Sequence, residues 1–388
     1  MKIINFFKNI IRKRNKGLVI LDDIFPSPLS PWRSNEYAEL CNVFKNTKIY
    51  TDCTTYIHYN QNKSYKENIS LLTSNYPSLK EKIYVLKKKT NINYDLAYTL
   101  FYNNLIKFYP TFEENNTNFA FTLYPGGGFG FNNEQIDSYL RKVCQSNYFK
   151  GVIVNQNITK TYLIEKKICK EDKIKLIFGV PLNLNLPEIK DYTYKKSSDC
   201  LNILFFANKY TSDGADKGFD VFLKIVKQLL YKKETFNFIV IGGFSENDVR
   251  DTEIKNIIDF KGSLNEFEFT KIVKETHILI SANRPFILSK NGFDGFPLAT
   301  CVTASLYGNL NFMTDYFNEA EKINLKGNEG FILIKDSIED IVANIIELDK
   351  DRVKLQKIAE NGRNKMLHLY SFENQITPRL EFFNNLLF

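Results

Sequence analysis

Two lysines border a loop between a predicted strand and a predicted helix in the second half of the chain. The strand over 202–206 is followed by Asn208 and Lys209. The loop then leads to Lys217, which begins a helix over 217–230. A helix N-terminus carries partial positive charge and unpaired N–H groups, so lysines beside it favour binding of a diphosphate. A solvated loop in a lysine-rich protein is the alternative interpretation.

A second polar motif, Asp294-Gly-Phe-Pro297, lies between a strand over 277–281 and a helix over 298–307. Gly295 lets the backbone approach a ligand closely. The start of the helix offers N–H donors to an anion, and Asp294 is placed to accept hydrogen bonds from sugar hydroxyls. Taken alone, the motif favours a simpler structure, a Gly-Pro turn with an acid that caps the helix.

Short apolar strands alternate with amphipathic helices along the whole chain, which is typical of parallel sheets with crossover helices. Such sheets bind ligands in the loops beyond the carboxyl ends of their strands. Helical patterns fill much of 66–110. The predicted strands lie at 18–21, 48–50, 119–124, 151–154, 174–178, 201–206, 236–241, 257–260, 277–281, 310–313 and 330–334.

The periodicity lapses after residue 180, where two prolines and a polar run mark a linker. We therefore expect an N-terminal domain at 17–180, a linker at 181–199 and a C-terminal domain at 200–370. The chain has 388 residues, and single cores stop growing well below this length, which also favours two domains.

Residues 1–16 carry six basic side chains and no acid, interleaved with isoleucine and phenylalanine. As a helix, this segment is basic and amphipathic and could lie on an anionic membrane surface. A solvated lead-in to the first strand is the alternative. No apolar run reaches the length of about 20 residues that a membrane span needs.

The composition favours a reduced, cytoplasmic protein. Six cysteines are scattered singly, without a C-x-x-C pair or a histidine cluster at metal-ligand spacing, so we expect no metal. The net charge is +8, but no arginine-rich stripe accompanies it, and a nucleic-acid partner is not favoured. If residues 1–16 bind a membrane, the protein is peripheral on its inner face.

Taken in order, the motifs of the second half resemble the retaining GT-B glycosyltransferases of group 1 (GT4 type). The order is a strand followed by Asn-Lys, Lys-Gly at a helix start, a strand ending in Gly242-Gly243, then Lys-Gly-Ser at 261–263 and Asp-Gly-Phe-Pro before a helix. The resemblance implies two Rossmann-like domains facing each other across a cleft, with residues 371–388 forming a helix that crosses back to the N-terminal domain.

By this resemblance, Lys209 falls on the phosphate-binding arginine of the family and Lys217 on its phosphate-binding lysine. Asp294 falls on the glutamate that contacts the donor sugar, so these three residues are the expected catalytic set. The donor, a nucleotide diphosphate sugar, is expected to contact Asn208, Gly243, Leu264, Gly295, Phe296, Pro297 and Thr303.

Three departures from the family pattern bear on activity. Lysine replaces arginine at 209, which keeps the charge and loses the bidentate fork. The loop between 209 and 217 is longer than usual. The second glutamate of the family, which commonly holds the nucleotide ribose, falls at Val302 or Thr303, and neither is a carboxylate.

In the first domain, the family places its acceptor loops after the early strands. The candidates are the loop over 30–34, with Trp32 and Arg33, and the loop over 124–129, with Gly127 and Gly128. An aromatic face can stack on a pyranose and an arginine can meet a phosphate or carboxylate. Simple loop packing and a tight turn into the next helix are the alternatives.

The resemblance implies retaining hexosyl transfer from a nucleotide diphosphate sugar to a glycan or lipid-linked acceptor in surface polysaccharide synthesis. No side-chain base is required, and no Ser-His-Asp set is found; His277 and His368 are expected to be structural, and His58 is a weak cleft candidate. The alternatives are a catalytically silent subunit that binds a partner or glycan, and a sugar-nucleotide epimerase, whose acid and base residues are not evident.

Overall fold

The computed structural model describes most of the chain, and every structural statement below concerns these residues. The predicted membrane-binding segment (apart from residues 15 and 16), the start of the 30–34 loop and His58 lie outside them. The described ranges are 15–26, 32–52, 64–88, 90–194, 196, 199–232, 235–264, 266–327, 329–334 and 337–388.

The first half of the chain forms a seven-stranded sheet in which all neighbouring strands are parallel, in the order β3-β2-β1-β4-β5-β6-β7. The strands are β1 (Asn15–Asp22), β2 (Lys48–Thr51), β3 (Ile83–Val85), β4 (Tyr94–Leu100), β5 (Phe119–Leu123), β6 (Phe149–Val154) and β7 (Ile174–Leu176). The helices of this half are α1 (Trp32–Val43), α3 (Tyr65–Asn75), α4 (Tyr102–Glu114), α5 (Glu134–Cys144) and α6 (Asn157–Glu165).

The second half forms a six-stranded parallel sheet in the order β10-β9-β8-β11-β12-β13. Its strands are β8 (Asn202–Phe206), β9 (Asn237–Ile241), β10 (Ile258–Gly262), β11 (Ile278–Ser281), β12 (Leu310–Met313) and β13 (Ile332–Leu333). Its helices are α8 (Phe219–Tyr231), α9 (Thr252–Ile257), α10 (Glu266–Glu275), α11 (Ala299–Leu306), α12 (Glu319–Lys322), α13 (Ile338–Lys350) and α14 (Arg352–Leu369).

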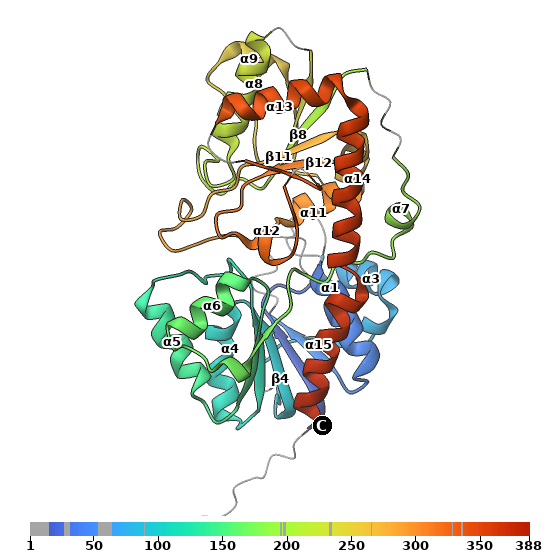
Figure 1. Cartoon of the computed structure of the whole chain (residues 1–388). Helices are drawn as coiled ribbons and strands as arrows, with labels where there is room; N and C mark the ends of the chain where they lie inside the picture. The colour runs from blue at the N-terminus through green and yellow to red at the C-terminus, as the bar shows by residue number, and fades with distance from the viewer. Residues whose placement is uncertain are drawn as a thin grey trace, which may run out of the picture.

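Along the chain, a segment that contains the short helix α7 (Pro187–Lys190) separates the two sheets. Each sheet with its helices forms one domain, and the two domains lie one above the other in Figure 1. Helix α14 runs along the upper domain, and α15 (Phe372–Leu387) continues down the lower one. There α15 packs against α1 and β4. The prediction of a two-domain α/β fold with a C-terminal helix on the first domain is thus confirmed.

Each sheet is stabilised by helices that pack their apolar faces against it. In α8, Phe219, Phe222, Ile225, Val226 and Leu229 are all buried and contact the buried side chains of the second sheet. Their spacing of three and four residues places them on one face of the helix. The helix therefore fixes the loop that precedes it, which carries Lys217, against the end of the sheet.

The expectation of helix over much of 66–110 is correct at its two ends, α3 and α4, and wrong between them, where β3 and β4 lie. Strand β4 is central, between β1 and β5, and all its residues except Asp95 are buried. A strand buried on both faces loses the polar–apolar alternation that identifies half-buried strands. Its apolar residues therefore merged with the pattern of the following helix α4.

Both sheets reverse their strand order at one point, between β1 and β4 in the first and between β8 and β11 in the second. In open parallel sheets, ligands bind at such switch points, beyond the carboxyl ends of the strands. The fold thus directs attention to the loops after these four strands. None of the helices within the described ranges is long and apolar enough to cross a membrane.

Candidate functional site

A cleft of about 320 Å³ lies between the domains, and loops from both switch points line it. The C-terminal domain contributes the loop after β8 and the loop from β11 to α11. The N-terminal domain contributes Trp32, at the start of α1, and Phe101, directly after β4. The polar and aromatic side chains that line it are Trp32, Phe101, Tyr124, Asn155, Gln156, Phe206, Asn208, Tyr210, Lys217, Asp294, Thr300 and Tyr370.

Lys217 is the cationic side chain among the described residues that line this cleft, and it is 8 % exposed. Its ammonium forms an ion pair and hydrogen bond with Asp294 and lies 4.0 Å from Oδ2 of Asp216. The ring of Tyr210 lies beneath it, with its centroid 5.0 Å from Nζ. The sequence therefore predicted correctly that these two motifs meet; their roles toward a ligand stay predictions.

Lys217 reaches this position because the backbone at Gly218, before α8, packs closely against the backbone at Ala282. Gly218 has φ +77°, and a Cβ atom there would lie 2.3 Å from the carbonyl oxygen of Ala282. Only glycine tolerates both the left-handed backbone and this contact. The approach places Lys217 directly beside the carboxyl end of β11, next to the Asp294 turn.

Asp294 is oriented by the C-terminal domain through Asn283 as well as Lys217. In the amide orientation that satisfies its neighbours, Nδ2 of Asn283 donates to Oδ2 of Asp294 at 3.1 Å and to the carbonyl of Asp216 at 2.8 Å. Asp294 remains 37 % exposed at its side chain. The carboxylate is thus held in place and still accessible to a ligand.

Lys209 does not line the cleft. Its ammonium binds Oδ1 of Asp248, 2.5 Å away, in the turn after β9. Partial burial alone would raise the pKa of the Asp248 carboxyl, but bonds from Lys209 and Ser245 outweigh it and hold the pKa below its ordinary value. The two predicted phosphate-binding lysines are therefore not together here: one faces the cleft, and the other is paired beside it.

The predicted donor contacts are divided in the same way. Asn208, Gly295 and Pro297 line the cleft. The backbone N–H of Phe296 is occupied by Gln156. Gly243 lies against the Cβ of Lys209, and Leu264 packs at the edge of the apolar core, so neither reaches the cleft.

The position of the missing glutamate lies on α11. Val302 is fully buried, whereas Thr303 lines a neighbouring cavity of about 530 Å³ that shares Trp32 and Ala299 with the cleft. Within the part of the chain that the structure describes, no side chain caps the N-terminus of α11, whose first residues also line the cleft. The free N–H groups at the start of this helix are therefore placed to bind an anion in the cleft.

An aromatic wall on the N-terminal domain lines the same cleft as the Lys217–Asp294 pair. It consists of Trp32, Phe101 and Tyr124, with ring centroids 4.6 to 6.0 Å apart. All three line the cleft. Trp32 was predicted from the sequence, although as part of a loop; it is instead the first residue of α1.

Arg33 was predicted to contact the acceptor, but its side chain pairs with carboxylates inside the N-terminal domain. Its side chain is 6 % exposed, and Nη1 binds Asp22 at 2.7 Å and Asp23 at 3.4 Å. Its guanidinium also lies 4.8 Å from the ring centroid of Phe101. Because its charge is already compensated inside the domain, the geometry does not support an acceptor contact.

Gly127 and Gly128 do not line the cleft either. A Cβ atom at Gly127 would lie 2.5 Å from the ring of Phe101, and one at Gly128 would lie 2.0 Å from Oδ1 of Asn103. Both have positive φ. The glycines thus allow the 124–129 turn to pack against the start of α4, which is the tight-turn alternative.

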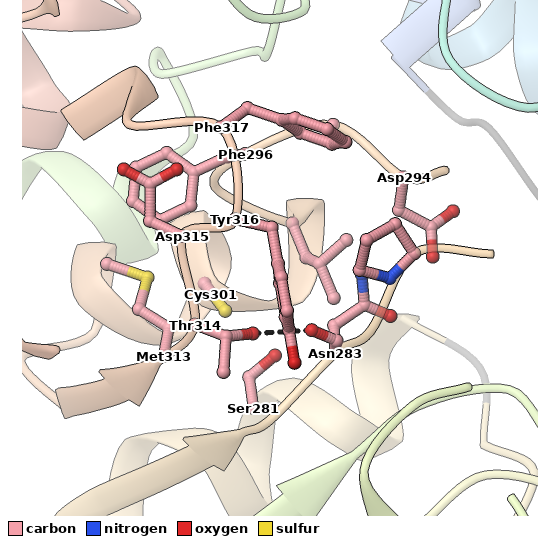
Figure 2. A pocket seen from close by; sticks show the side chains of 13 residues that line it. Ser281, Asn283, Asp294, Phe296, Cys301, Met313, Thr314, Asp315, Tyr316 and Phe317 are labelled. Atoms are coloured by element: carbon pink, nitrogen blue, oxygen red, sulfur yellow. Dashed lines mark hydrogen bonds between the residues drawn. The ribbon is translucent and has the colours of Figure 1, made fainter. Parts of the chain in front are cut away.

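A smaller pocket lies behind the Asp294 turn, at the carboxyl ends of β11 and β12 (Figure 2). The hydroxyl of Thr314 donates to the carbonyl of Asn283 there, at 2.5 Å. The pocket has a volume of about 30 Å³, room for about one or two water molecules. A hexose does not fit there. The interdomain cleft is the candidate sugar site, because both Lys217 and Asp294 line it.

The site residues that the sequence analysis missed include Phe101, Gln156, Tyr210, Asn283 and Tyr370. Phe101 was hidden because β4 was not recognised. Gln156 and Asn283 each follow a recognised strand by two residues, β6 and β11 respectively. The rule that ligands meet the carboxyl ends of parallel strands would have identified both.

Comparison with known proteins shows which family the second domain resembles. Residues 202–365 match the family model described as glycosyl transferases group 1. The second domain of this chain is therefore a glycosyl transferases group 1 domain. A search of curated proteins finds no match.

Three solved structures illustrate the shared fold. A glycosyltransferase from Rickettsia africae is 15 % identical, with a TM-score of 0.67 over 97 % of this chain and 99 % of that one. Anabaena HepE, solved with UDP-glucose, is 13 % identical, with a TM-score of 0.65 over 95 % and 99 %. Sucrose-phosphate synthase from Thermosynechococcus elongatus is 11 % identical, with a TM-score of 0.63 over 96 % and 99 %. At these identities the likeness establishes the GT-B fold.

The described ranges contain no group of three or more His, Cys, Asp or Glu side chains arranged to hold a metal ion. The five cysteines within these ranges are unpaired: Cys41, Cys144, Cys169, Cys200 and Cys301.

Proposed function

We propose that this protein transfers a hexose from a nucleotide diphosphate sugar to a glycan acceptor. One observation carries the proposal: a nearly buried lysine and an accessible carboxylate meet at the switch point of the group 1 domain, opposite an aromatic wall. A cation suits the leaving diphosphate, and a carboxylate suits the hydroxyls of the attached sugar. HepE, which shares the fold, binds UDP-glucose.

In this proposal the diphosphate exchanges places with Asp294 as the partner of Lys217. The released carboxylate then accepts hydrogen bonds from the sugar. Lys217 and the uncapped start of α11 stabilise the negative charge that builds on the leaving diphosphate, which is electrostatic catalysis without proton transfer. The diphosphate itself assists removal of the acceptor proton on the same face, which gives retention at the anomeric carbon.

Lys209 joins the site only when it leaves Asp248. Without it, the described charges around Lys217 are two carboxylates, Asp216 and Asp294, against one ammonium. A diphosphate adds further negative charge, so a second cation improves the balance. We infer that donor binding draws the ammonium of Lys209 from Asp248 toward the cleft.

The acceptor lies on the other side, against Trp32, Phe101 and Tyr124. Flat aromatic faces suit the apolar face of a pyranose, which favours a sugar acceptor. A lipid-linked glycan of a surface polysaccharide, reached at the inner face of a membrane through residues 1–16, fits the basic N-terminal segment.

A catalytically silent, glycan-binding subunit is the second candidate. It is favoured by the buried Val302 and by the absence of a carboxylate at Thr303, where the family holds the ribose. Such a subunit retains the aromatic wall but has no use for Lys217.

A panel of UDP-, GDP-, ADP- and CMP-sugars separates the two candidates. The transferase is expected to be stabilised thermally by at least one donor and to hydrolyse it slowly to the nucleoside diphosphate (for a CMP-sugar, the monophosphate). If no donor raises the melting temperature or is hydrolysed, the transferase proposal is wrong. Binding of glycans without any donor effect would instead support the silent subunit.

A further inference from the structure

Gln156 is a buried side chain of the N-terminal domain that binds the backbone of the Asp294 turn across the domain interface. It is 2 % exposed and precedes α6. Its Oε1 accepts from the N–H of Phe296 at 2.9 Å, and its Nε2 donates to the carbonyl of Phe296 at 3.1 Å. One side chain thus satisfies both backbone groups of a residue two positions after Asp294.

The other end of the turn is also fixed to the N-terminal domain. The ring of Phe293 stacks on Phe131, with centroids 4.1 Å apart and planes 18° apart. Asn291 accepts from the N–H of Phe131 at 2.9 Å and donates back to its carbonyl at 2.6 Å. Asp294 therefore lies between two anchors that belong to the opposite domain.

Gly295 makes the approach of Gln156 possible. A Cβ atom at this position would lie 3.3 Å from Nε2 of Gln156 and 3.5 Å from Cγ of Pro125. A side chain here would push the turn away from the N-terminal domain. The glycine of the Asp-Gly-Phe-Pro motif thus serves a contact between domains as well as the cleft.

A second contact crosses the same interface without touching the turn. Glu319, fully buried at the start of α12, accepts from the N–H groups of Asn157 at 2.9 Å and Ile158 at 2.6 Å. It caps α6 from the C-terminal domain. Glu319 therefore provides a matched comparison: it joins the same domains, next to Gln156, but does not hold the turn of Asp294.

We propose that Gln156 is a positioning residue: it holds the 294–297 turn so that the Asp294 carboxylate stays aligned with the donor sugar when the domains are together. The inference rests on the proposed function for its catalytic consequence. Its structural part, the fixation of the turn, does not. Joining the domains and placing the carboxylate are then coupled, because the Gln156 amide takes part in both.

The test replaces Gln156 by methionine, which conserves length and removes both hydrogen bonds. Small misplacements at a reacting centre are costly, so kcat is expected to fall about tenfold to a hundredfold. The donor Kd is expected to change less than about threefold, because the donor's charge is held by other groups. Gln156→Asn, which keeps the amide but is too short to reach both atoms, should give the same pattern and covers the case in which Gln156→Met does not fold.

Hydrogen exchange of the peptide covering 291–298, measured without ligand, reads the turn directly. It should be faster in both Gln156 variants than in the wild type and unchanged in Glu319→Gln, which should also retain kcat. Unchanged exchange in the Gln156 variants, or faster exchange with full kcat, would overturn the inference. An equal loss of kcat in Glu319→Gln would do so as well, since it would reduce Gln156 to general interface stability.

If the wild type acts on no sugar nucleotide, the proposed function fails, and the exchange measurement still decides whether Gln156 fixes the turn.

Discussion

The two domains share one strand order, yet they use the charged side chains at their switch points in opposite ways. In the first, Asp22 ends β1 and is fully buried, bound by Arg33, the hydroxyl of Tyr37 and the N–H of Ile24. In the second, Lys217 and Asp294 pair at the cleft, and the carboxylate remains accessible. At the first switch point the charged side chains bind one another inside the domain and aromatic rings line the cleft. At the second, the charged pair itself lines the cleft.

This difference shows that the switch-point topology alone does not make a binding site. A buried ion pair whose hydrogen bonds are made inside the domain has little left for a substrate. The same topology becomes a charge-binding site only where the pair can be exchanged for a ligand. Arg33 and Lys217 were both proposed as ligand contacts, and only their burial and partners distinguish them.

The largest expected effect is on the stability of the first switch point. Arg33→Met leaves Asp22 buried without its cation, and the free energy of unfolding is expected to fall by about 3 kcal/mol. Tyr37 and Ile24 still bond Asp22, which keeps the loss near the lower end for such pairs. Urea denaturation measures it. The partly exposed pair of Lys227 and Asp251 is the control, and Lys227→Met should barely move the midpoint. A small loss for Arg33→Met would show that the first pair is not structural.

The next effect is on activity at the second switch point. Lys217→Ala removes the cation that faces the leaving diphosphate, and kcat is expected to fall about a hundredfold. The melting temperature without ligand should change little in comparison. Lys224→Ala, on the exposed face of α8, is the matched control. Full turnover in Lys217→Ala would remove the basis for the proposed site.

A smaller effect is a difference between the two domains in how their stability depends on pH. Burial lowers the pKa of His277 in the C-terminal domain to about 4, with nearby Lys196 and Arg352 adding to the shift. Its Nδ1 accepts from the N–H of Asn202, which requires the neutral form. Below its unfolded pKa of about 6.5 the unfolded chain binds a proton that the folded chain refuses, so stability is lost as pH falls from there toward 4.

At pH 5 the loss from His277 is expected to be on the order of 2 kcal/mol relative to pH 7. Hydrogen exchange at the two pH values should therefore show the C-terminal domain opening first. In His277→Gln this pH dependence should be reduced. Burial instead raises the pKa of Asp22 in the N-terminal domain, partly opposed by Arg33, so that group does not weaken its domain in acid. Earlier opening of the N-terminal domain would contradict this comparison.

The smallest effect concerns the second lysine. Asp248→Asn removes the carboxylate that holds Lys209, so the ammonium reaches the cleft at lower cost. Donor affinity is expected to rise about twofold to fivefold, in line with the loss of one partly exposed ion pair. Isothermal titration with the preferred donor measures it. Unchanged affinity would indicate that Lys209 does not take part.

The sequence was sufficient for the fold and for the expectation that Lys217 and the Asp294 turn meet. The order of the strand ends, Lys217 and the Asp294 motif also supported the resemblance to the group 1 glycosyltransferases. It was not sufficient for Lys209 or Arg33, since the choice between a ligand and a neighbouring carboxylate depends on residues distant in sequence, Asp248 and Asp22. Phe101 was missed because a strand buried on both faces carries no alternation.

The central claim is that the diphosphate of a sugar nucleotide binds at Lys217, where it replaces Asp294. A structure of the protein with a bound nucleoside diphosphate tests this most directly. We expect a phosphate oxygen within hydrogen-bond distance of Nζ of Lys217 and the carboxylate of Asp294 displaced from it. A nucleotide bound elsewhere, with the Lys217–Asp294 pair intact, would contradict the account.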